Sequence, residues 1–286
     1  MIRADRNKPV MVQNKFESNE GQCLEYLTFP KLSQLEGIRH LFTTRLGGVS
    51  KGIYSSMNLS FTRGDEEEAV LENYRRISRL LGTDAEHVVC SDQTHTVNIR
   101  YVTKEDAGKG VVRPRDYQDI DGLITDVEEL CLATFYADCV PLYFVDPVKR
   151  VIGLAHSGWR GTVERMGEHM VKAMVERFGC RPGDIIAAIG PSICRDCYEI
   201  SEEVAVRFKE GFWADKEVLS SGKAPGKYQL DLWRANEEVL LGTGILPEHL
   251  DVTDVCTCCN SDYLFSHRAS HGQRGNLGAF LMLGKS

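Results

Sequence analysis

The sequence has no long apolar run and no concentration of positive charge. No stretch of its 286 residues approaches the about 18 consecutive apolar residues of a membrane helix, and residues 1–22 are polar and mixed in charge. With 34 Lys and Arg against 41 Asp and Glu, the net charge is −7. These absences argue against nucleic acid or a membrane as a partner, and they predict a cytoplasmic protein without an export signal. No protein partner is predicted.

Cysteine is present at low density, with ten residues in the whole chain. A disulfide scaffold is typical of short secreted chains, so we expect reduced thiols here. Two local groups stand out, Cys194-Arg-Asp-Cys197 and Cys256-Thr-Cys-Cys259. The gap of roughly sixty residues between them matches no common zinc ribbon or finger spacing. We therefore favour buried thiols that pack as small hydrophobes over a shared four-cysteine zinc site.

The chain has the composition of a soluble globular protein, with 42% hydrophobic and 26% charged residues. Helical periodicity is found in residues 66–81, 163–178, 201–211 and 231–241. Apolar runs predict strands at residues 38–44, 88–90, 97–102, 121–126, 132–135, 141–145, 151–155, 184–189, 250–255, 264–268 and 277–283. Because strands and helices do not strictly alternate, we expect a single α+β domain, an α/β sandwich with a mixed, largely antiparallel sheet flanked by helices. Residues 1–34 resemble an irregular lead-in to it.

Two strands in the middle of the chain are close enough to form a hairpin. Pro141–Val145 and Val151–Ala155 flank the segment Asp146-Pro-Val-Lys149, which is typical of a turn with proline at its second position. A crossover helix does not fit between strands so close together. We therefore expect them to pair antiparallel.

The hairpin brings two metal-binding side chains together. Cys139 lies eight residues before Pro147, and His156 lies eight residues after Val148. A turn centred between Pro147 and Val148 sets the thiol opposite the imidazole, with Cβ atoms about 4.5–5.5 Å apart, and one metal ion can bridge that gap. A one-residue slip would separate the two side chains onto different faces unless Cys139 lies just outside the regular ladder. The spacing alone predicts a two-ligand site.

Other segments carry polar groups that suit a binding site. Arg45 and the Gly47-Gly48 turn follow a predicted strand, where exposed amides beside a guanidinium can bind an anion, although a solvated arginine on a glycine turn fits equally well. Asn58 follows in a loop that can return to the same place. Arg160 opens the helix after the hairpin, whose N-terminal amides also suit an anion. His95 lies in a polar turn, where a solvated histidine is the more common outcome.

Several motifs occur in the order of a known family. They are Leu41-Phe-Thr-Thr-Arg-Leu-Gly-Gly-Val-Ser50, Ser56-Met-Asn-Leu59, Gln93-Thr-His95, Asp121-Gly122, Ala137-Asp-Cys139-Val-Pro141, Ala155-His156-Ser-Gly-Trp-Arg-Gly161, Ile189-Gly-Pro191 and Phe265-Ser-His-Arg268. Over roughly residues 35–283 the chain resembles the YfiH family, also known as peptidoglycan editing factor PgeF or the laccase-domain family. The segment around His156 is the most specific part. The resemblance implies that residues 35–286 form the catalytic domain.

The resemblance also implies a metal site. In that family a zinc ion is held by a histidine, the cysteine of Ala-Asp-Cys and a second histidine, which correspond here to His95, Cys139 and His156. Thr96 follows His95 where the family usually has glycine, a change that stiffens the loop but keeps the ligand. Three protein ligands leave a fourth tetrahedral position open, as in catalytic zinc sites. We expect about one zinc per chain.

An activity follows from the same resemblance. Related proteins are reported as purine nucleoside phosphorylases that also deaminate adenosine, and others as peptidoglycan editing enzymes. We therefore expect a zinc-dependent phosphorylase that converts adenosine, inosine or methylthioadenosine and phosphate to free base and ribose 1-phosphate, with adenosine deaminase activity. Purine nucleoside and phosphate are the expected partners. Arg45, Asn58 and Arg160 are the expected substrate and phosphate binders.

Three alternatives remain at this stage. A multicopper polyphenol oxidase, the family's older label, needs many imidazoles, and eight histidines without a His-x-His pair argue against it. A metal-free hydrolase that edits peptidoglycan precursors, with Cys139 as nucleophile and His156 as base, fits the hairpin equally well. In a third alternative, the zinc only stabilises a non-catalytic binding protein. Metal content and turnover distinguish these alternatives.

Overall fold

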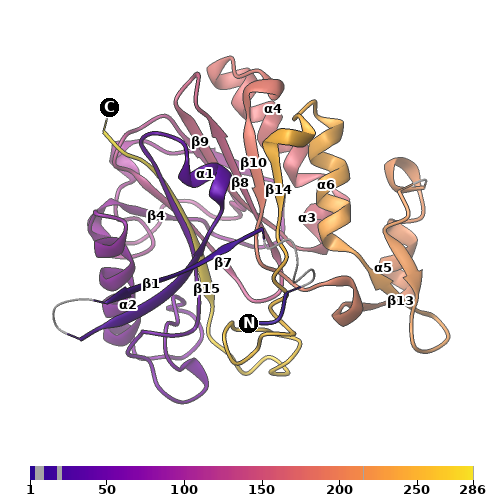
Figure 1. Cartoon of the computed structure of the whole chain (residues 1–286), viewed down its shortest axis with the longest axis horizontal. Helices are drawn as coiled ribbons and strands as arrows, with labels where there is room; N and C mark the ends of the chain where they lie inside the picture. Colours follow the sequence, from indigo (N-terminus) through magenta and orange to yellow (C-terminus); the bar gives the residue numbers. More distant parts are fainter. Residues whose placement is uncertain (4–9, 18–20, 215, 286) are drawn as a thin grey trace.

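Two six-stranded β-sheets pack face to face in the computed structural model, which describes residues 1–3, 10–17, 21–214 and 216–285 (Figure 1). The first sheet has the spatial order β1 (Val12–Glu17), β2 (Cys23–Thr28), β3 (Ile38–Thr43), β15 (Leu277–Leu283), β7 (Cys131–Tyr136) and β4 (Val88–Cys90). The second has the order β14 (Leu250–Val252), β10 (Ile186–Ile189), β8 (Val140–Asp146), β9 (Val151–Ser157), β6 (Gly122–Thr125) and β5 (Ile99–Tyr101). A third, smaller sheet consists of β11 (Glu199–Ser201), β13 (Lys227–Leu230) and β12 (Leu219–Ser221).

Helices cover the outer faces of the two large sheets. The α-helices of the described residues are α1 (Pro30–Ser33), α2 (Glu67–Leu80), α3 (Trp159–Val163), α4 (Met166–Phe178), α5 (Glu202–Arg207) and α6 (Leu232–Gly242). One side of the molecule carries α2, packed on the first sheet, and the other carries α3, α4 and α6, packed on the second (Figure 1). Only β4–β7, β5–β6 and β10–β14 pair in parallel among the described strands. The expected α+β class with mixed, largely antiparallel pairing is confirmed.

Alternation along the strands separates the core into layers. In β8, Leu142 and Phe144 pack toward the helices, whereas Tyr143 and Val145 pack between the two sheets. The period of two residues in a strand produces this division. Each central strand is consequently buried on both faces, and the layer between the sheets has its own apolar core.

The predicted hairpin is confirmed, but its turn lies one residue further along the chain. β8 and β9 pair antiparallel around the four-residue loop Pro147–Arg150. Moving the turn centre by one residue moves every cross-strand partner by two, so His156 lies opposite Pro141 rather than Cys139. A shift of two keeps both side chains on the same face, so the pairing of Cys139 with His156 is diagonal instead of direct.

Residues 1–34 are not the irregular lead-in that the sequence suggests. In their described part, β1 and β2 form an edge of the first sheet, and α1 follows them. Most side chains of β1 are exposed, so no apolar run marks it as a strand. Conversely, residues 264–268 form bends and turns rather than the expected strand.

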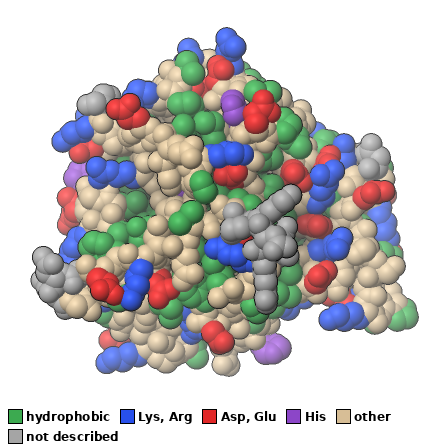
Figure 2. All heavy atoms as spheres, in the orientation of Figure 1, with side chains coloured by type: hydrophobic (Ala, Val, Ile, Leu, Met, Phe, Trp, Pro, Cys, Tyr) green, Lys and Arg blue, Asp and Glu red, His purple; other side chains and the backbone are tan. Residues whose placement is uncertain are grey.

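Charged side chains of both signs are found on the face of the molecule shown in Figure 2. On the face shown in Figure 2, acidic and basic groups are interspersed rather than gathered by sign. This distribution agrees with the absence of a basic cluster in the sequence. Among the described residues, no helix combines the length and the apolar composition that crossing a membrane requires.

Candidate metal centre

A cysteine and two histidines converge at one end of the β8–β9 hairpin. Val145 on β8 and Leu154 on β9 point between the two sheets, and the same alternation turns Cys139 and His156 to that face. His95 approaches from the turn after β4, with a left-handed backbone (φ 68°). One ligating atom from each of the three residues lies within 4.8 Å of the other two. The structure thus brings together the three residues combined in the sequence analysis.

A buried carboxylate, Asp121 at the start of β6, holds both histidines in place. Its Oδ1 lies 2.7 Å from Nδ1 of His156, and its side chain accepts hydrogen bonds from the backbone amides of Thr94, His95 and Thr96. A carboxylate at Nδ1 fixes the proton there and leaves Nε2 as the donor for a metal. Asp121 therefore orients one histidine directly and shapes the turn that carries the other.

The electrostatics of the three residues favour a thiolate. Burial opposes charge on Cys139, yet the neighbouring His156 and His95 outweigh it and lower the pKa of the thiol to about 6. Burial also opposes an imidazolium at His156, but Cys139 and Asp121 raise the pKa of the imidazole to about 9. A thiolate is the form of cysteine that ligates metals and attacks electrophiles.

Gly158, the N-cap residue of α3, leaves space for two of the three side chains, His95 and Cys139. A Cβ at this position would lie 2.9 Å from Cδ2 of His95 and 3.1 Å from Sγ of Cys139. Its φ of −74° is accessible to any residue. Close approach of the ligands, rather than backbone conformation, therefore explains glycine here.

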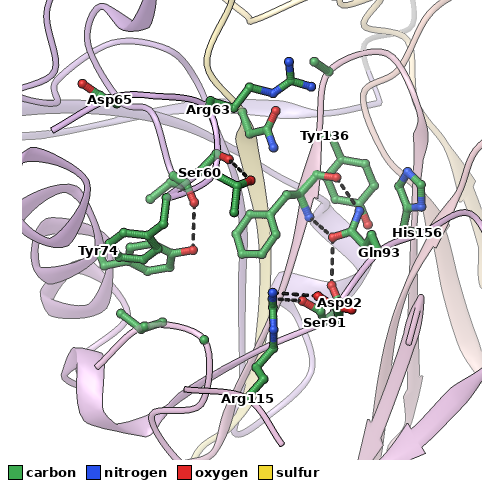
Figure 3. Close-up of a pocket in the computed structure, with 18 of the residues that line it drawn as sticks. Ser60, Arg63, Asp65, Tyr74, Ser91, Asp92, Gln93, Arg115, Tyr136 and His156 are labelled. Atoms are coloured by element: carbon green, nitrogen blue, oxygen red, sulfur yellow. Dashed lines mark hydrogen bonds and ion pairs between the residues drawn. The ribbon is translucent and has the colours of Figure 1, made fainter. Parts of the chain in front are cut away.

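A large cavity opens beside the three residues. Its volume is about 810 Å³, within the range of small-molecule sites, and it is lined by residues 59–63, 65, 67, 74, 91–93, 95, 110–115, 135–137, 139, 156, 274 and 276. Figure 3 shows Arg63 and Arg115 on opposite sides of the cavity, with His156 and Tyr136 next to each other along a third side. The metal centre is thus accessible to a ligand in the cavity.

Arg63 and Arg274, which line the cavity, have no acidic partner among the described residues. Arg63 has no hydrogen-bond or ion-pair partner for its guanidinium among the described residues. Arg274 is 9% exposed and donates to the carbonyl of Gly275 and the side chain of Asn276, and its Nε has no partner in the described structure. Burial, with the charge of Arg63 as a second cause, lowers the pKa of Arg274 to about 10. An anion between the two guanidinium groups would relieve this repulsion.

The expected substrate binders lie elsewhere. Arg45 donates to the carbonyls of Ser55 and Ser261 and lies over the ring of Phe265, and it does not line the cavity. Arg160 is exposed and lies over Trp159, outside the cavity lining.

Asn58 is fully buried beneath the cavity wall rather than exposed in it. Its side chain bonds the backbone of Ser60 and the backbone amide of Asn276, two residues that do line the cavity. The amide of Gly48, in the turn beside Arg45, is also engaged, by the hydroxyl of Ser56. Asn58 therefore shapes the wall, and this glycine turn packs within the protein.

Three residues of the site carried weak signals in the sequence. Asp121, directly before the buried strand β6, stands out in the sequence only as part of the Asp121-Gly122 motif, without a role at the metal site. Arg63 and Arg274 lie in loops far apart in the chain, where a single arginine usually is solvated. Only the fold reveals that both line the same cavity.

The structure corrects the expectation for the two cysteine groups. Sulfur atoms of Cys194, Cys197, Cys256 and Cys259 lie within 4.8 Å of one another. Cys259 is exposed, so this group is not a set of independent buried thiols. The spacing argument failed because the fold, rather than a local ribbon, supplies the proximity.

Comparisons with known proteins agree on one family. Residues 39–284 match the family model described as multi-copper polyphenol oxidoreductase laccase. The chain is 37% identical over 246 residues to purine nucleoside phosphorylase YlmD of Bacillus subtilis strain 168, covering 84% of this chain and 86% of that protein. It is 31% identical over 246 residues to adenosine deaminase RL5 of an unknown prokaryotic organism, covering 86% and 93% respectively.

Solved structures show the same fold. The crystal structure of YlmD from Geobacillus stearothermophilus superimposes with a TM-score of 0.87 at 34% identity and covers 97% of this chain and 100% of that one. The hypothetical protein YfiH of Bacillus licheniformis gives a TM-score of 0.86 at 34% identity, with coverage of 90% and 96%.

Proposed function

The chain belongs to the family described as multi-copper polyphenol oxidoreductase laccase, and we propose that it is a zinc-dependent purine nucleoside phosphorylase that also deaminates adenosine. The membership confirms the resemblance to the YfiH family. Adenosine, inosine and methylthioadenosine are the proposed nucleosides, with phosphate as the second substrate. The observation that carries the proposal is the meeting of His95, Cys139 and His156 beside a cavity lined also by Arg63 and Arg274, which have no acidic partner among the described residues.

The donor set of the metal centre suits zinc. Two imidazoles and one thiolate form a three-ligand site with an open position, the arrangement of catalytic zinc. Its two imidazoles fall well short of the many that a trinuclear copper cluster requires. When bound, zinc supplies Lewis acidity next to the cavity. The protein's own contribution is orientation, through the hydrogen bond from His156 to Asp121 and the space left by Gly158.

Phosphate fits between Arg63 and Arg274. In phosphorolysis a phosphate oxygen joins the anomeric carbon while the glycosidic C–N bond breaks and the purine takes up a proton. Two guanidinium groups without acidic partners can neutralise the anion and align its oxygen toward the sugar. We therefore assign the phosphate subsite to these arginines rather than to Arg45, Asn58 and Arg160, which lie outside the cavity lining.

Aromatic rings provide a surface for the purine. Phe61 and Phe135 line the cavity and are partly exposed, and Phe61 stacks on Tyr74 with ring centroids 5.5 Å apart and planes 3° apart. Phe135 is held through its backbone by Gln93, whose side chain bonds both the amide and the carbonyl. A flat base can stack on such fixed rings at little entropic cost. His156 lines the same cavity, so a base placed on these rings shares the cavity with the proposed metal centre.

Product analysis tests the proposal. Zinc-loaded protein is incubated with adenosine, with and without phosphate, and the products are separated by chromatography. We expect adenine and ribose 1-phosphate only when phosphate is present, and inosine in both mixtures. Release of neither base nor inosine would contradict the proposal, as would copper-dependent oxidation of phenols as the only activity.

A cysteine hydrolase acting on peptidoglycan precursors is the second candidate. One observation favours it, a relay of three side chains. Cys139 would be the nucleophile, His156 beside it the base, and Asp121 the carboxylate that orients His156. Such a mechanism needs no metal. Hydrolysis of a precursor peptide by metal-free protein would support this candidate over the phosphorylase.

A further inference from the structure

The four-cysteine cluster consists of two Cys-x-x-Cys pairs on different loops. Cys194 and Cys197 follow β10, and Cys256 and Cys259 follow β14. β10 and β14 are parallel neighbours, so both chains leave the second sheet at the same edge. A bridge between Ser192 and Cys256 extends this pairing beyond the strands. Proximity of the two pairs is therefore a property of the sheet.

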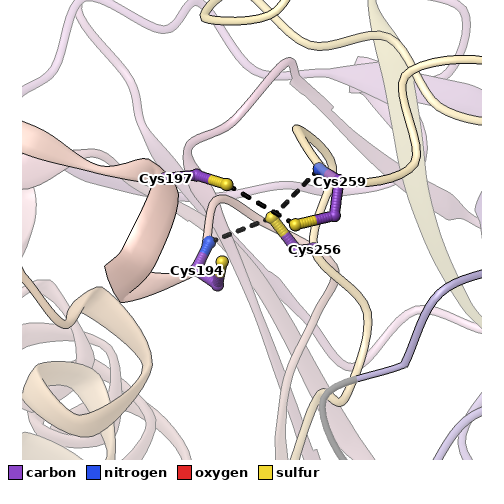
Figure 4. Close-up of side chains that lie close together, drawn as sticks. All are labelled: Cys194, Cys197, Cys256 and Cys259. Atoms are coloured by element: carbon purple, nitrogen blue, oxygen red, sulfur yellow. Dashed lines mark hydrogen bonds between the residues drawn. The ribbon is translucent and has the colours of Figure 1, made fainter.

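The sulfur atoms face one another. The Sγ atoms of Cys197 and Cys259 lie 3.5 Å apart, and Figure 4 shows the sulfur of Cys197 directed toward those of Cys256 and Cys259. Tetrahedral coordination with zinc–sulfur bonds of about 2.3 Å places sulfur atoms about 3.8 Å apart. The distance between Cys197 and Cys259 is close to that value, and the other sulfur atoms of the cluster lie within 4.8 Å of one another.

Backbone amides also point at the cluster. The amides of Cys194 and Cys259 donate to Sγ of Cys256, at 3.2 and 3.4 Å. Donors aimed at a sulfur stabilise its thiolate form, which is the form that ligates metals. Arg268 reaches this region but donates to the carbonyls of Cys197 and Glu199. No protein cation is bonded to the four sulfur atoms among the described residues, and a metal would supply the positive charge that thiolates need.

We propose that Cys194, Cys197, Cys256 and Cys259 bind a structural zinc ion, separate from the centre at His95, Cys139 and His156. Four sulfur donors in a tetrahedral arrangement select zinc or iron. We choose zinc because four cysteine ligands with no open position are typical of structural zinc sites. The chain would then hold two zinc ions rather than the one expected from its sequence motifs.

This second site connects to the first through Asp138. Thr257, between two of the cluster's cysteines, donates to the carboxylate of Asp138 at 2.7 Å, and the amide of Arg268 donates to its other oxygen at 2.7 Å. The backbone of Asp138 is left-handed (φ 90°) and precedes Cys139. A zinc ion that joins the two loops would therefore hold the bend from which Cys139 reaches its own metal. The cluster acts as a positioning element for that ligand.

Metal content of purified protein variants tests the proposal. We expect about two zinc per chain in the wild-type protein, about one in Cys197→Ser and in Cys139→Ala, and none in the double variant. Cys258→Ser is the matched control, because Cys258 lies in the same loop but outside the cluster, and it should retain two. One zinc in the wild-type protein, unchanged by Cys197→Ser, would overturn the proposal.

X-ray absorption at the zinc edge of the wild-type protein provides a readout that needs no variant. Two sites give five sulfur and two histidine nitrogen ligands over two zinc ions, whereas the first centre alone gives one sulfur and two nitrogens. The sulfur-rich spectrum is expected. A spectrum with the nitrogen-rich ratio would contradict the proposed zinc site. So would iron in the cluster, or a disulfide between Cys197 and Cys259 in protein prepared under reducing conditions. None of these outcomes depends on nucleoside turnover.

Discussion

At the metal centre, the carboxylate of Asp121 supports the ligands through five hydrogen-bonded groups: the imidazole of His156, three backbone amides around His95 and the hydroxyl of Thr96. We expect Asp121→Asn to weaken zinc binding by about 10- to 100-fold, because the amide cannot hold the proton on Nδ1 of His156 as a carboxylate does. Competition with a fluorescent chelator measures this affinity directly. Nucleoside turnover at limiting zinc should fall in parallel.

Asp119→Asn is the control for that experiment. Asp119 accepts a hydrogen bond from the hydroxyl of Thr94 in the same turn, but the described structure shows no contact of its carboxylate with His156. Its zinc affinity should remain within about twofold of wild type, since the neutral amide can still accept that bond. Equal zinc affinity in Asp121→Asn and the wild-type protein would show that the carboxylate does not support the centre.

The phosphate subsite makes a separate prediction at the residue scale. Replacing Arg63 with glutamine removes a charged donor, worth about 1.5–3 kcal/mol, so the KM for phosphate should rise about 10- to 100-fold. Deamination of adenosine consumes no phosphate and should change little. Steady-state kinetics of the two reactions on the same preparation measure both effects.

Arg45→Gln separates the structural assignment from the one made on sequence. Arg45 donates to two backbone carbonyls away from the cavity, so its loss should lower the free energy of unfolding and leave the KM for phosphate unchanged. If the KM for phosphate rose in Arg45→Gln but not in Arg63→Gln, the phosphate subsite would instead lie at Arg45 and the glycine turn.

Residues were predictable from sequence where local spacing decides their position. The spacing about the hairpin was enough to predict that Cys139 and His156 lie together. The observed register differs from the predicted one by two residues, and such a shift keeps both side chains on the same face. His95 required the resemblance to a family, since a polar turn can point anywhere. Arg63 and Arg274 could not be predicted, because the distance between two loops depends on the whole sheet.

Among the elements, strands with alternating or continuous apolar residues were predictable, and β1 was not, because most of its side chains are exposed. The parallel pairing of β10 with β14 also escaped prediction, although it determines that the two cysteine groups meet. Local patterns identify a strand, but its neighbours in the sheet are fixed by packing over long sequence separations.

The start of α3 gives a prediction at the scale of an element. Gly158→Ala would add a Cβ 2.9 Å from the ring of His95 and 3.1 Å from Sγ of Cys139. Because these atoms cannot stay in place, we expect zinc affinity to fall about tenfold or more, while the helix itself, with φ at −74°, tolerates alanine. Chelator competition and circular dichroism measure the two effects.

Gly183→Ala is the matched control, since a Cβ there meets no atom within 4 Å and its φ is not left-handed. It should bind zinc as the wild-type protein does. If Gly158→Ala also kept wild-type zinc affinity, the close packing of α3 against the ligands would have no part in the site.

For the whole molecule, a buried histidine makes stability depend on pH. His40 is 6% exposed, its Nε2 accepts the amide of Phe29 at 2.8 Å, and burial lowers its pKa to about 4. The unfolded chain takes up a proton near pH 6.5 while the folded one does not, so the stability is complete above pH 6.5 and falls as pH drops toward 4. The loss through this group is about 3 kcal/mol in the free energy of unfolding.

Urea unfolding of the wild-type protein and His40→Gln between pH 7.5 and about pH 4 measures this contribution. Glutamine keeps an acceptor for the amide of Phe29 but does not titrate, so the difference in free energy between the two proteins should shrink as pH falls. A difference that stays constant across this range would show that His40 does not titrate with folding.

The central claim is that zinc at His95, Cys139 and His156 is required for purine nucleoside chemistry in the adjoining cavity. The most direct measurement is the rate of adenine and inosine formation from adenosine and phosphate by metal-stripped protein during stepwise return of zinc. We predict that both products are absent without metal and that both rates rise together with zinc, whereas the Cys139→Ala variant stays inactive at every zinc concentration. Full activity in the metal-stripped protein, or recovery of Cys139→Ala by zinc, would contradict the account.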